Sequence, residues 1–323
     1  MDARRSTPPA RVSAARPWLG RVLGLVAAFG ALGVGPARAA DVSAACAAGE
    51  AGGNTSLTIT SSGIRREAVL HVPRIDAGRP VPLIVALHGS GSDGRRFARD
   101  SGLSSLADQD KFAVVYPSSL GAEWAISGRE RDVRFGADLL DRVESLTCID
   151  QRRVYATGVS IGAGMAARLA CELSDRIAAI VLVSGGYKSL PACTPDRPVS
   201  VLEIHGTSDP TVPYSGTGPG HAGAVLPYVT GWATRDRCAA RPAKRVVAAH
   251  TLLYDWSGCA GGTVVEHLRI YGGGHGLPNA EGAEISSGAR SPISGARNIW
   301  HFLASRILQS PFAGPAPPPA VGA

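Results

Sequence analysis

The chain has 323 residues, a formal net charge of +7, 45% hydrophobic residues and 18% charged residues. This balance supplies enough apolar surface for a folded core and excludes a mainly disordered chain. Aromatic residues make up only 6%, the basic residues are scattered and no nucleic-acid-binding motif occurs, so we expect no nucleic-acid partner.

Residues 1–40 have the features of a secretory signal peptide. They hold six arginines and one acidic residue, which leaves 27 basic and 25 acidic residues in the rest of the chain. The apolar run Val22–Val34 has 13 residues and is followed by Ala37-Arg38-Ala39. It is shorter than the ~20 residues that cross a bilayer. We therefore predict export to the periplasm or medium, cleavage after Ala39 or Ala40, and no membrane anchor.

All six cysteines lie beyond this leader, at Cys46, Cys148, Cys171, Cys193, Cys238 and Cys259. An even number of cysteines in an oxidising compartment favours disulfides over a thiolate metal site. No Cys-x-x-Cys pair or Cys/His cluster occurs, so we predict no metal site. The spacing alone does not choose among the many pairings that six cysteines allow.

After the leader, strand-like and helix-like segments alternate. Leu57–Thr60 and Ala68–Val72, separated by Ser-Ser-Gly, predict an antiparallel hairpin. Apolar runs too short for helices predict buried parallel strands at Pro82–Leu87, Phe112–Tyr116, Val154–Thr157, Ile177–Val183, Val199–His205 and Val264–Ile270. Helical patterns fall at Phe135–Leu146, Ala163–Leu173, Val229–Arg237 and Ala296–Leu308.

This alternation predicts an α/β fold with a mostly parallel central sheet and helices on both faces. We expect one catalytic domain over residues 41–310. The Pro/Ala-rich tail from residue 311 to residue 323 is predicted to be disordered.

The pentapeptide Gly158-Val159-Ser160-Ile161-Gly162 joins a predicted strand directly to a predicted helix. A turn this tight strains the backbone of its central residue, and the flanking glycines relieve clashes there. Ser160 would then project above the sheet edge beside a helix N-terminus, whose amides favour developing negative charge. The alternative is a chance match in a chain with 40 glycines. The strand and helix on either side favour a nucleophile.

A serine nucleophile needs a histidine base that is oriented by an acid, and in α/β-hydrolases the chain order is Ser, Asp or Glu, His. Asp209 follows the strand that ends at His205, and His275 follows the last strand within Gly272-Gly273-Gly274-His275. The structural alternatives are a turn-forming Asp209 and an exposed loop histidine. The other histidines precede the acid, lie within an element or lack a strand-end setting: His71, His88, His205, His221, His250, His267 and His301.

An oxyanion hole requires two backbone N–H groups, one from the residue after the nucleophile and one from the loop after the third strand. We assign them to Ile161 and Ser90, with Gly89 as the second choice for the loop. The glycines of that loop also match G-x-G-x-x-G, a dinucleotide-binding pattern. No acid follows the next strand to hold a ribose, so we predict no nucleotide.

With these segments in hand, the chain resembles the secreted esterase family that contains polyhydroxybutyrate depolymerases, feruloyl esterases and acetylxylan esterases. The matching segments include VPLIVALHG, SGLSSLADQDKFAVVYP, CIDQRRVYATGVSIGAGMAARLACE, VSVLEIHGTSDPTVPYSG, residues Trp232 to Cys238, and LRIYGGGH. The resemblance runs from about Cys46 to about Leu308. It implies an α/β-hydrolase fold, no cofactor, acyl-enzyme ester hydrolysis on Ser160, Asp209 and His275, and a Cys238–Cys259 disulfide.

Three departures from that family's pattern bear on substrate choice. Ala163 stands where the elbow usually continues with glycine, and Ser90 stands where a cysteine is frequent. After His275 the chain reads Gly276-Leu277-Pro278-Asn279, where the family favours His-x-Trp-Pro-Gly. Losing that tryptophan is expected to reshape the acyl pocket. None of the three removes a catalytic group.

We therefore predict a serine carboxylic-ester hydrolase that acts on a small ester or a polymer end and needs no obligate protein partner. Trp124 and Tyr214 are candidate pocket aromatics, with core packing as the alternative for each. Two other functions stay open: an acyltransferase or peptidase on the same fold, and an exported binding protein without catalysis.

Overall fold

The computed structural model describes residues 44–47, 49–128, 130–187, 190–217, 223–276 and 295–310. All of them belong to one compact unit, Val42–Ala323. The predicted leader and the predicted disordered tail lie outside the described residues. Among the described helices, none is long and apolar enough to cross a membrane.

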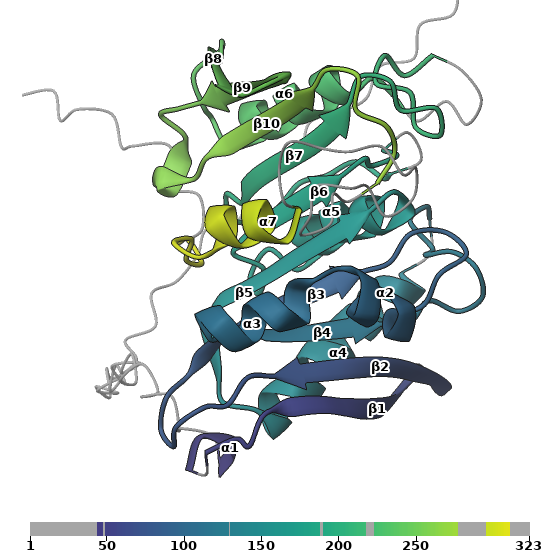
Figure 1. Ribbon diagram of the computed structural model, residues 1–323, viewed down its shortest axis with the longest axis vertical. Helices are drawn as coiled ribbons and strands as arrows, with labels where there is room; N and C mark the ends of the chain where they lie inside the picture. Colours follow the sequence, from purple (N-terminus) through teal and green to yellow (C-terminus); the bar gives the residue numbers. More distant parts are fainter. Residues whose placement is uncertain are drawn as a thin grey trace, which may run out of the picture. The chain divides into compact units, whose positions relative to one another are not determined.

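A single ten-stranded sheet organises the unit, with the order β1-β2-β4-β3-β5-β6-β7-β10-β9-β8 (Figure 1). The strands are β1 (Gly53–Ser61), β2 (Ile64–Val72), β3 (Val81–Leu87), β4 (Ala113–Pro117), β5 (Ile149–Val159), β6 (Ala179–Val183), β7 (Ser200–Gly206), β8 (Ala243–Ala248), β9 (Thr251–Trp256) and β10 (Val265–Ile270). From β4 to β10 neighbouring strands pair in parallel, and antiparallel pairs lie at both ends. The predicted opening hairpin and mostly parallel sheet are confirmed.

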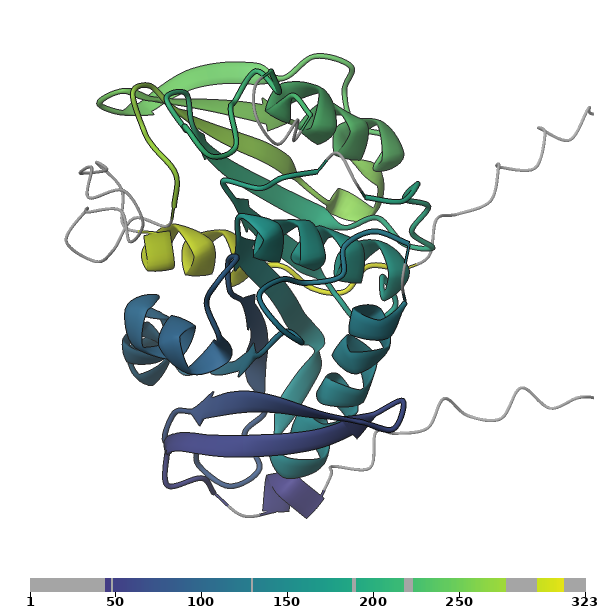
Figure 2. The ribbon, with the colours of Figure 1, turned by 90° about the vertical axis from the view of Figure 1, so that its right-hand side faces the viewer.

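Helices cover both faces of the sheet, as predicted. The α-helices are α1 (Ala44–Ala47), α2 (Gly94–Asp100), α3 (Leu103–Asp110), α4 (Arg131–Leu146), α5 (Ile161–Glu172), α6 (Val225–Arg235) and α7 (Gly295–Leu303), and a 3₁₀ turn η1 spans Ala260–Gly262. Side chains of α4, α5 and α6 pack in one hydrophobic core, and those of α2, α3 and α7 pack in a second. Figure 2 shows the two helical layers on opposite sides of the strands.

Several elements differ from the sequence-based prediction. Helices α1, α2 and α3, strands β8 and β9 and the turn η1 were not expected. The α2 sequence GRRFARD buries little beyond Phe97, and β8 is exposed along nearly its whole length, so neither shows a strong hydrophobic period. Helix α7 ends at Leu303 rather than at Leu308.

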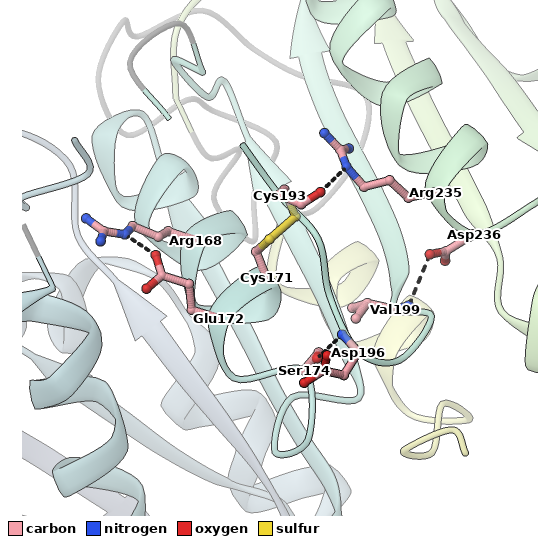
Figure 3. Close-up of a disulfide and its surroundings, with 9 residues drawn as sticks. All are labelled: Arg168, Cys171, Glu172, Ser174, Cys193, Asp196, Val199, Arg235 and Asp236. Atoms are coloured by element: carbon pink, nitrogen blue, oxygen red, sulfur yellow. Dashed lines mark hydrogen bonds and ion pairs between the residues drawn. A yellow bond between two sulfur atoms is a disulfide. The ribbon is translucent and has the colours of Figure 1, made fainter. Parts of the chain in front are cut away.

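Three disulfides join distant parts of the chain: Cys46–Cys148, Cys171–Cys193 and Cys238–Cys259. The last is the pair that the family resemblance implied. Figure 3 shows how the second attaches the segment after β6 to helix α5. Arg235 Nε of α6 also donates to the Cys193 carbonyl over 3.1 Å, so this connecting segment is held from both α5 and α6.

Candidate active site

Ser160 occupies the sharp turn between β5 and α5. Its backbone has φ 58° and ψ −123°, and residues that carry a side chain rarely adopt a positive φ. The Ser160 N–H donates to the Val183 carbonyl (2.9 Å), and its own carbonyl accepts from Ala163 N–H (3.0 Å). Bonds to β6 on one side and to α5 on the other hold the turn in this conformation.

Close packing around this turn requires both glycines of the pentapeptide. A Cβ on Gly158 would lie 2.3 Å from the Gly162 backbone. A Cβ on Gly162 would lie 2.3 Å from the Leu87 carbonyl oxygen and 2.5 Å from that of His88. Glycine at position 162 therefore lets α5 begin directly against the end of β3.

A pocket of about 470 Å³ opens at Ser160. Ser160 and His275 both line it, together with residues of the loop after β3 and of helix α2. The loops that meet here follow the carboxyl ends of β3, β5, β7 and β10, which pair in parallel and so end at one edge of the sheet. Ligand sites in open α/β sheets lie at this edge.

The structure brings Asp209 and His275 into direct contact. His275 Nδ1 lies 2.8 Å from Asp209 Oδ2. Asp209 Oδ1 accepts backbone N–H groups of Thr211 (2.8 Å) and Val212 (2.7 Å). Burial would raise the pKa of Asp209, but hydrogen bonds from His205, His275 and Val212 outweigh burial and hold that pKa well below its usual value. Asp209 is therefore a carboxylate at neutral pH.

The glycine-rich loop that carries His275 lies against the end of β7. A Cβ on Gly206 would lie 2.2 Å from the Gly273 carbonyl oxygen. Ser208 N–H donates to that same carbonyl over 2.9 Å, and Gly276 N–H donates to Ser184 Oγ over 3.3 Å. These contacts place His275 beside the loop after β7 that carries Asp209, which we call the acid loop. The predicted departure at Leu277, Pro278 and Asn279 lies outside the described residues.

The loop after β3 carries the predicted oxyanion donor Ser90, and hydrogen bonds of His88 fix this loop. Ser119 N–H donates to His88 Nε2 (3.1 Å), so the ring hydrogen is on Nδ1, which lies 2.8 Å from the Gly89 carbonyl. Burial lowers the pKa of His88, which agrees with this neutral tautomer. A Cβ on Gly89 would lie 3.6 Å from Ser160 Cβ. Ser90 lines the pocket, and Ile161 is the first residue of α5.

The two candidate pocket aromatics lie elsewhere. Trp124 is 4% exposed, and its indole N–H donates to the His88 carbonyl over 3.0 Å. The Tyr214 hydroxyl lies 2.7 Å from His267 Nε2. Neither is among the described residues that line the pocket. Their predicted contact with substrate stays a prediction, and what the structure describes for Trp124 is core packing.

Several pocket residues were not predicted from the sequence. Arg96, Phe97 and Asp100 of α2 line the pocket, and so does Thr211. Arg96 Nε and Asp100 Oδ2 lie 3.4 Å apart. Asp93, whose side chain accepts from Arg96 N–H (2.8 Å), caps the start of this helix. An acid at the N-cap was the one available signal for α2. Within the described ranges, no cluster of three or more His, Cys, Asp or Glu residues could hold a metal ion.

The mostly parallel sheet, the strained elbow and the pocket at the strand ends define an α/β-hydrolase fold. The solved structure of an acetyl xylan esterase from Aspergillus awamori has this fold, with a TM-score of 0.59, 17% identity, and coverage of 78% of this chain and 99% of that one. Residues 67–210 match the family model described as Esterase PHB depolymerase.

Two curated relatives extend that match. A putative esterase, NocK, of Nocardia uniformis subsp. tsuyamanensis is 30% identical over 69% of this chain and 74% of its own length. Feruloyl esterase C of Emericella nidulans is 31% identical over 69% of this chain and 82% of its own length. The chain therefore belongs to the PHB depolymerase esterase family and is a carboxylic-ester hydrolase.

Proposed function

We propose that the protein is an exported esterase that hydrolyses its substrate through an acyl-enzyme on Ser160. The observation that carries the proposal is the joint placement of three groups. Ser160 sits on a strained turn, and His275 lines the same pocket. Asp209 Oδ2 lies 2.8 Å from His275 Nδ1, and the other ring nitrogen, Nε2, would accept the serine proton. This is the arrangement that serine hydrolases use.

In the proposed reaction, Ser160 Oγ attacks the ester carbonyl carbon while His275 Nε2 accepts its proton. The N–H groups of Ile161 and Ser90 donate to the oxyanion of the tetrahedral intermediate. His275 then gives the proton to the departing alcohol, which leaves an acyl-Ser160 ester. Water attacks that ester with His275 again as base. The acid and free Ser160 are released, so the enzyme ends unchanged.

The pocket supports a carboxylic ester of moderate size as substrate. Its volume of about 470 Å³ exceeds what an acetyl group alone needs. Phe97 offers an apolar surface, and Arg96 and Asp100 offer polar contacts. Together with the names of the relatives, this supports hydroxyalkanoate, feruloyl or acetylated carbohydrate esters as the classes to test.

The triad is tested by Ser160→Ala. Turnover of a p-nitrophenyl ester is expected to fall by about 10⁴-fold or more, because alanine at this position has no hydroxyl to form the acyl-enzyme. Ser145→Ala, an exposed serine of α4, is the matched control and should keep the wild-type rate. A Ser160→Ala variant with a near-normal rate would show that the nucleophile is misassigned.

A fluorophosphonate probe separates catalysis from binding alone. It is expected to label Ser160 in the wild-type protein and to leave the Ser160→Ala variant unlabelled. Intact wild-type protein that takes up no probe would instead favour a binding protein. Addition of an alcohol acceptor tests transfer, since an acyltransferase would form a new ester in place of free acid.

Export is supported by the three disulfides, which include every cysteine of the chain. Expression of the full chain in a bacterial host is expected to place the esterase outside the cytoplasm. A version without residues 1–40 should stay inside and accumulate with reduced cysteines. Equal distribution of the two versions would contradict the predicted leader.

A further inference from the structure

Buried ionisable side chains continue from Asp209 into the sheet, between β7 and β10. Glu203 and His205 belong to β7 and His267 to β10, and each is 0% exposed. Glu203 and His267 are directly paired positions in the two strands. Burying such groups away from water is costly unless they pair with one another.

His205 lies between two carboxylates. Its Nδ1 is 2.8 Å from Glu203 Oε1, and its Nε2 is 2.9 Å from the Val212 carbonyl oxygen and 3.3 Å from Asp209 Oδ2. A backbone carbonyl can only accept, so Nε2 carries a hydrogen. Nδ1 faces a carboxylate oxygen. An imidazolium, which donates from both nitrogens, satisfies all of these contacts.

Other groups complete the surroundings of Glu203. The Tyr187 hydroxyl donates to its Oε1 over 3.1 Å, and His267 Nδ1 lies 2.7 Å from its Oε2. His267 Nε2 lies 2.7 Å from the Tyr214 hydroxyl. Burial would raise the pKa of Glu203, but the His205 charge and the hydrogen bonds from both histidines lower it to about 2.

The charged groups near His205 favour its protonated form. Burial would lower the pKa of His205, but the Glu203 charge and the hydrogen bonds to Asp209 and Glu203 raise it to about 10. The Tyr214 ring faces it edge-on at 5.8 Å between centroids, and the Arg269 guanidinium lies 4.8 Å from that tyrosine ring.

We propose that His205 is a positioning residue for the esterase reaction, an imidazolium that fixes the Asp209 carboxylate and offsets part of its charge. The inference rests on the proposed roles of Asp209 and His275. By binding both the Val212 carbonyl and Asp209 Oδ2, His205 holds the two ends of the turn that presents the acid. Its charge also acts on His275 through the shared oxygen atom.

That shared oxygen gives the proposal a measurable consequence. Asp209 Oδ2 faces His275 Nδ1 at 2.8 Å and His205 Nε2 at 3.3 Å. A carboxylate stabilises a neighbouring imidazolium, and a second cation on the same carboxylate weakens that effect. Without the His205 charge, Asp209 should stabilise protonated His275 more strongly. Since only neutral His275 can accept the serine proton, activity would then begin at a higher pH.

The test compares His205→Gln with the wild-type protein. Glutamine can keep an N–H donor toward Val212 and Asp209 but carries no charge. The acidic limb of the kcat/KM profile is expected to move upward by about one pH unit. Glu203→Gln combined with His205→Gln removes the buried pair without leaving an unpaired charge, and it should move the limb in the same direction. Tyr187→Phe removes one uncharged hydrogen bond from Glu203 and should leave the limb in place.

A purely structural His205 would give a different result. Activity and thermal stability would fall in both His205 variants while the acidic limb stayed unchanged, and that outcome would overturn the proposal. If the variants do not fold, a measurement on the wild-type protein still tests whether His205 is charged. Nitrogen chemical shifts of labelled histidine should show one imidazole protonated on both nitrogens from about pH 5 to about pH 9. Ordinary titration of every histidine near neutral pH would contradict the charge.

Failure of this inference can be told apart from failure of the proposed function. An unshifted limb together with an inactive Ser160→Ala variant would remove only the role of His205. An active Ser160→Ala variant would remove the catalytic assignment on which that role rests.

Discussion

Single atoms around the Ser160 turn decide how closely α5 approaches β3. Gly162 has no side chain, and the carbonyl oxygens of Leu87 and His88 occupy the space where a Cβ would be. Gly231, in the interior of α6, is a contrasting case. Its nearest neighbour to an added Cβ is the flexible end of Arg235, at 3.4 Å.

Gly162→Ala is expected to lower the free energy of unfolding by about 2 kcal/mol, because backbone oxygens cannot move aside as a side chain can. Ester turnover should fall further, since the shift displaces Ser160. Gly231→Ala is the matched control and should raise stability by about 0.5–1 kcal/mol through helix propensity. Urea unfolding measures both, and equal effects of the two changes would contradict the close contact.

At the scale of elements, two disulfides attach segments outside the sheet: Cys46 belongs to α1, and Cys193 lies between β6 and β7. Cys171–Cys193 closes a separation of 22 residues, and Cys46–Cys148 closes one of 102. The first attaches the segment that carries Tyr187, and Tyr187 donates to Glu203 beneath the acid loop. Loss of this bridge therefore affects stability first and the acid loop second.

Cys171→Ser with Cys193→Ser is expected to lower the free energy of unfolding by about 3 kcal/mol. Cys46→Ser with Cys148→Ser should cost more, about 4–5 kcal/mol, because the unfolded chain regains a longer loop. Urea titrations of both double variants test this order. A larger loss at Cys171–Cys193 would indicate that native contacts, rather than chain entropy, dominate.

For the whole molecule, buried ionisable groups set how stability depends on pH. The pKa of Glu203 falls from 4.5 to about 2, so ionised Glu203 stabilises the fold at pH values above 4.5. This contribution is lost as the pH falls from 4.5 through about 2. His205, whose pKa rises to about 10, stabilises the fold fully below 6.5 and loses its contribution as pH rises toward 10. Burial raises the pKa of Asp236 from 3.8 to about 7, so this group destabilises the fold increasingly as pH rises between those values and fully above them.

Asp236→Asn is expected to stabilise the protein at neutral and alkaline pH, on the order of 2 kcal/mol, and to change little near pH 4. The asparagine oxygen can still accept Val199 N–H, which lies 3.3 Å from Asp236 Oδ1. Chemical unfolding at about pH 4.5 and about pH 8 measures the difference between variant and wild type. A difference that stays constant with pH would mean that Asp236 has the same pKa in the folded and unfolded states.

Much of the fold was predictable because its signals are local. Buried parallel strands are continuous apolar runs, and β3 through β7 lie within one or two residues of their predicted ends, apart from the longer β5. The pentapeptide at Ser160 could be recognised because a strand, a glycine-flanked turn and a helix are contiguous in the chain. Helix α2 was missed because a short polar helix with one buried aromatic has no clear period.

The sequence by itself determined the fold class, the family and the order of Ser160, Asp209 and His275 along the chain, since each depends on patterns within one or two elements. The tertiary structure alone decided the pairing of Cys46, Cys148, Cys171 and Cys193, the pocket face of α2, and the position of His205 between two carboxylates. The last of these lies where β7 pairs with β10, and Glu203 and His267 meet there across 64 residues of sequence. No local pattern encodes that contact, because long-range strand pairing is selected by burial of the whole sheet.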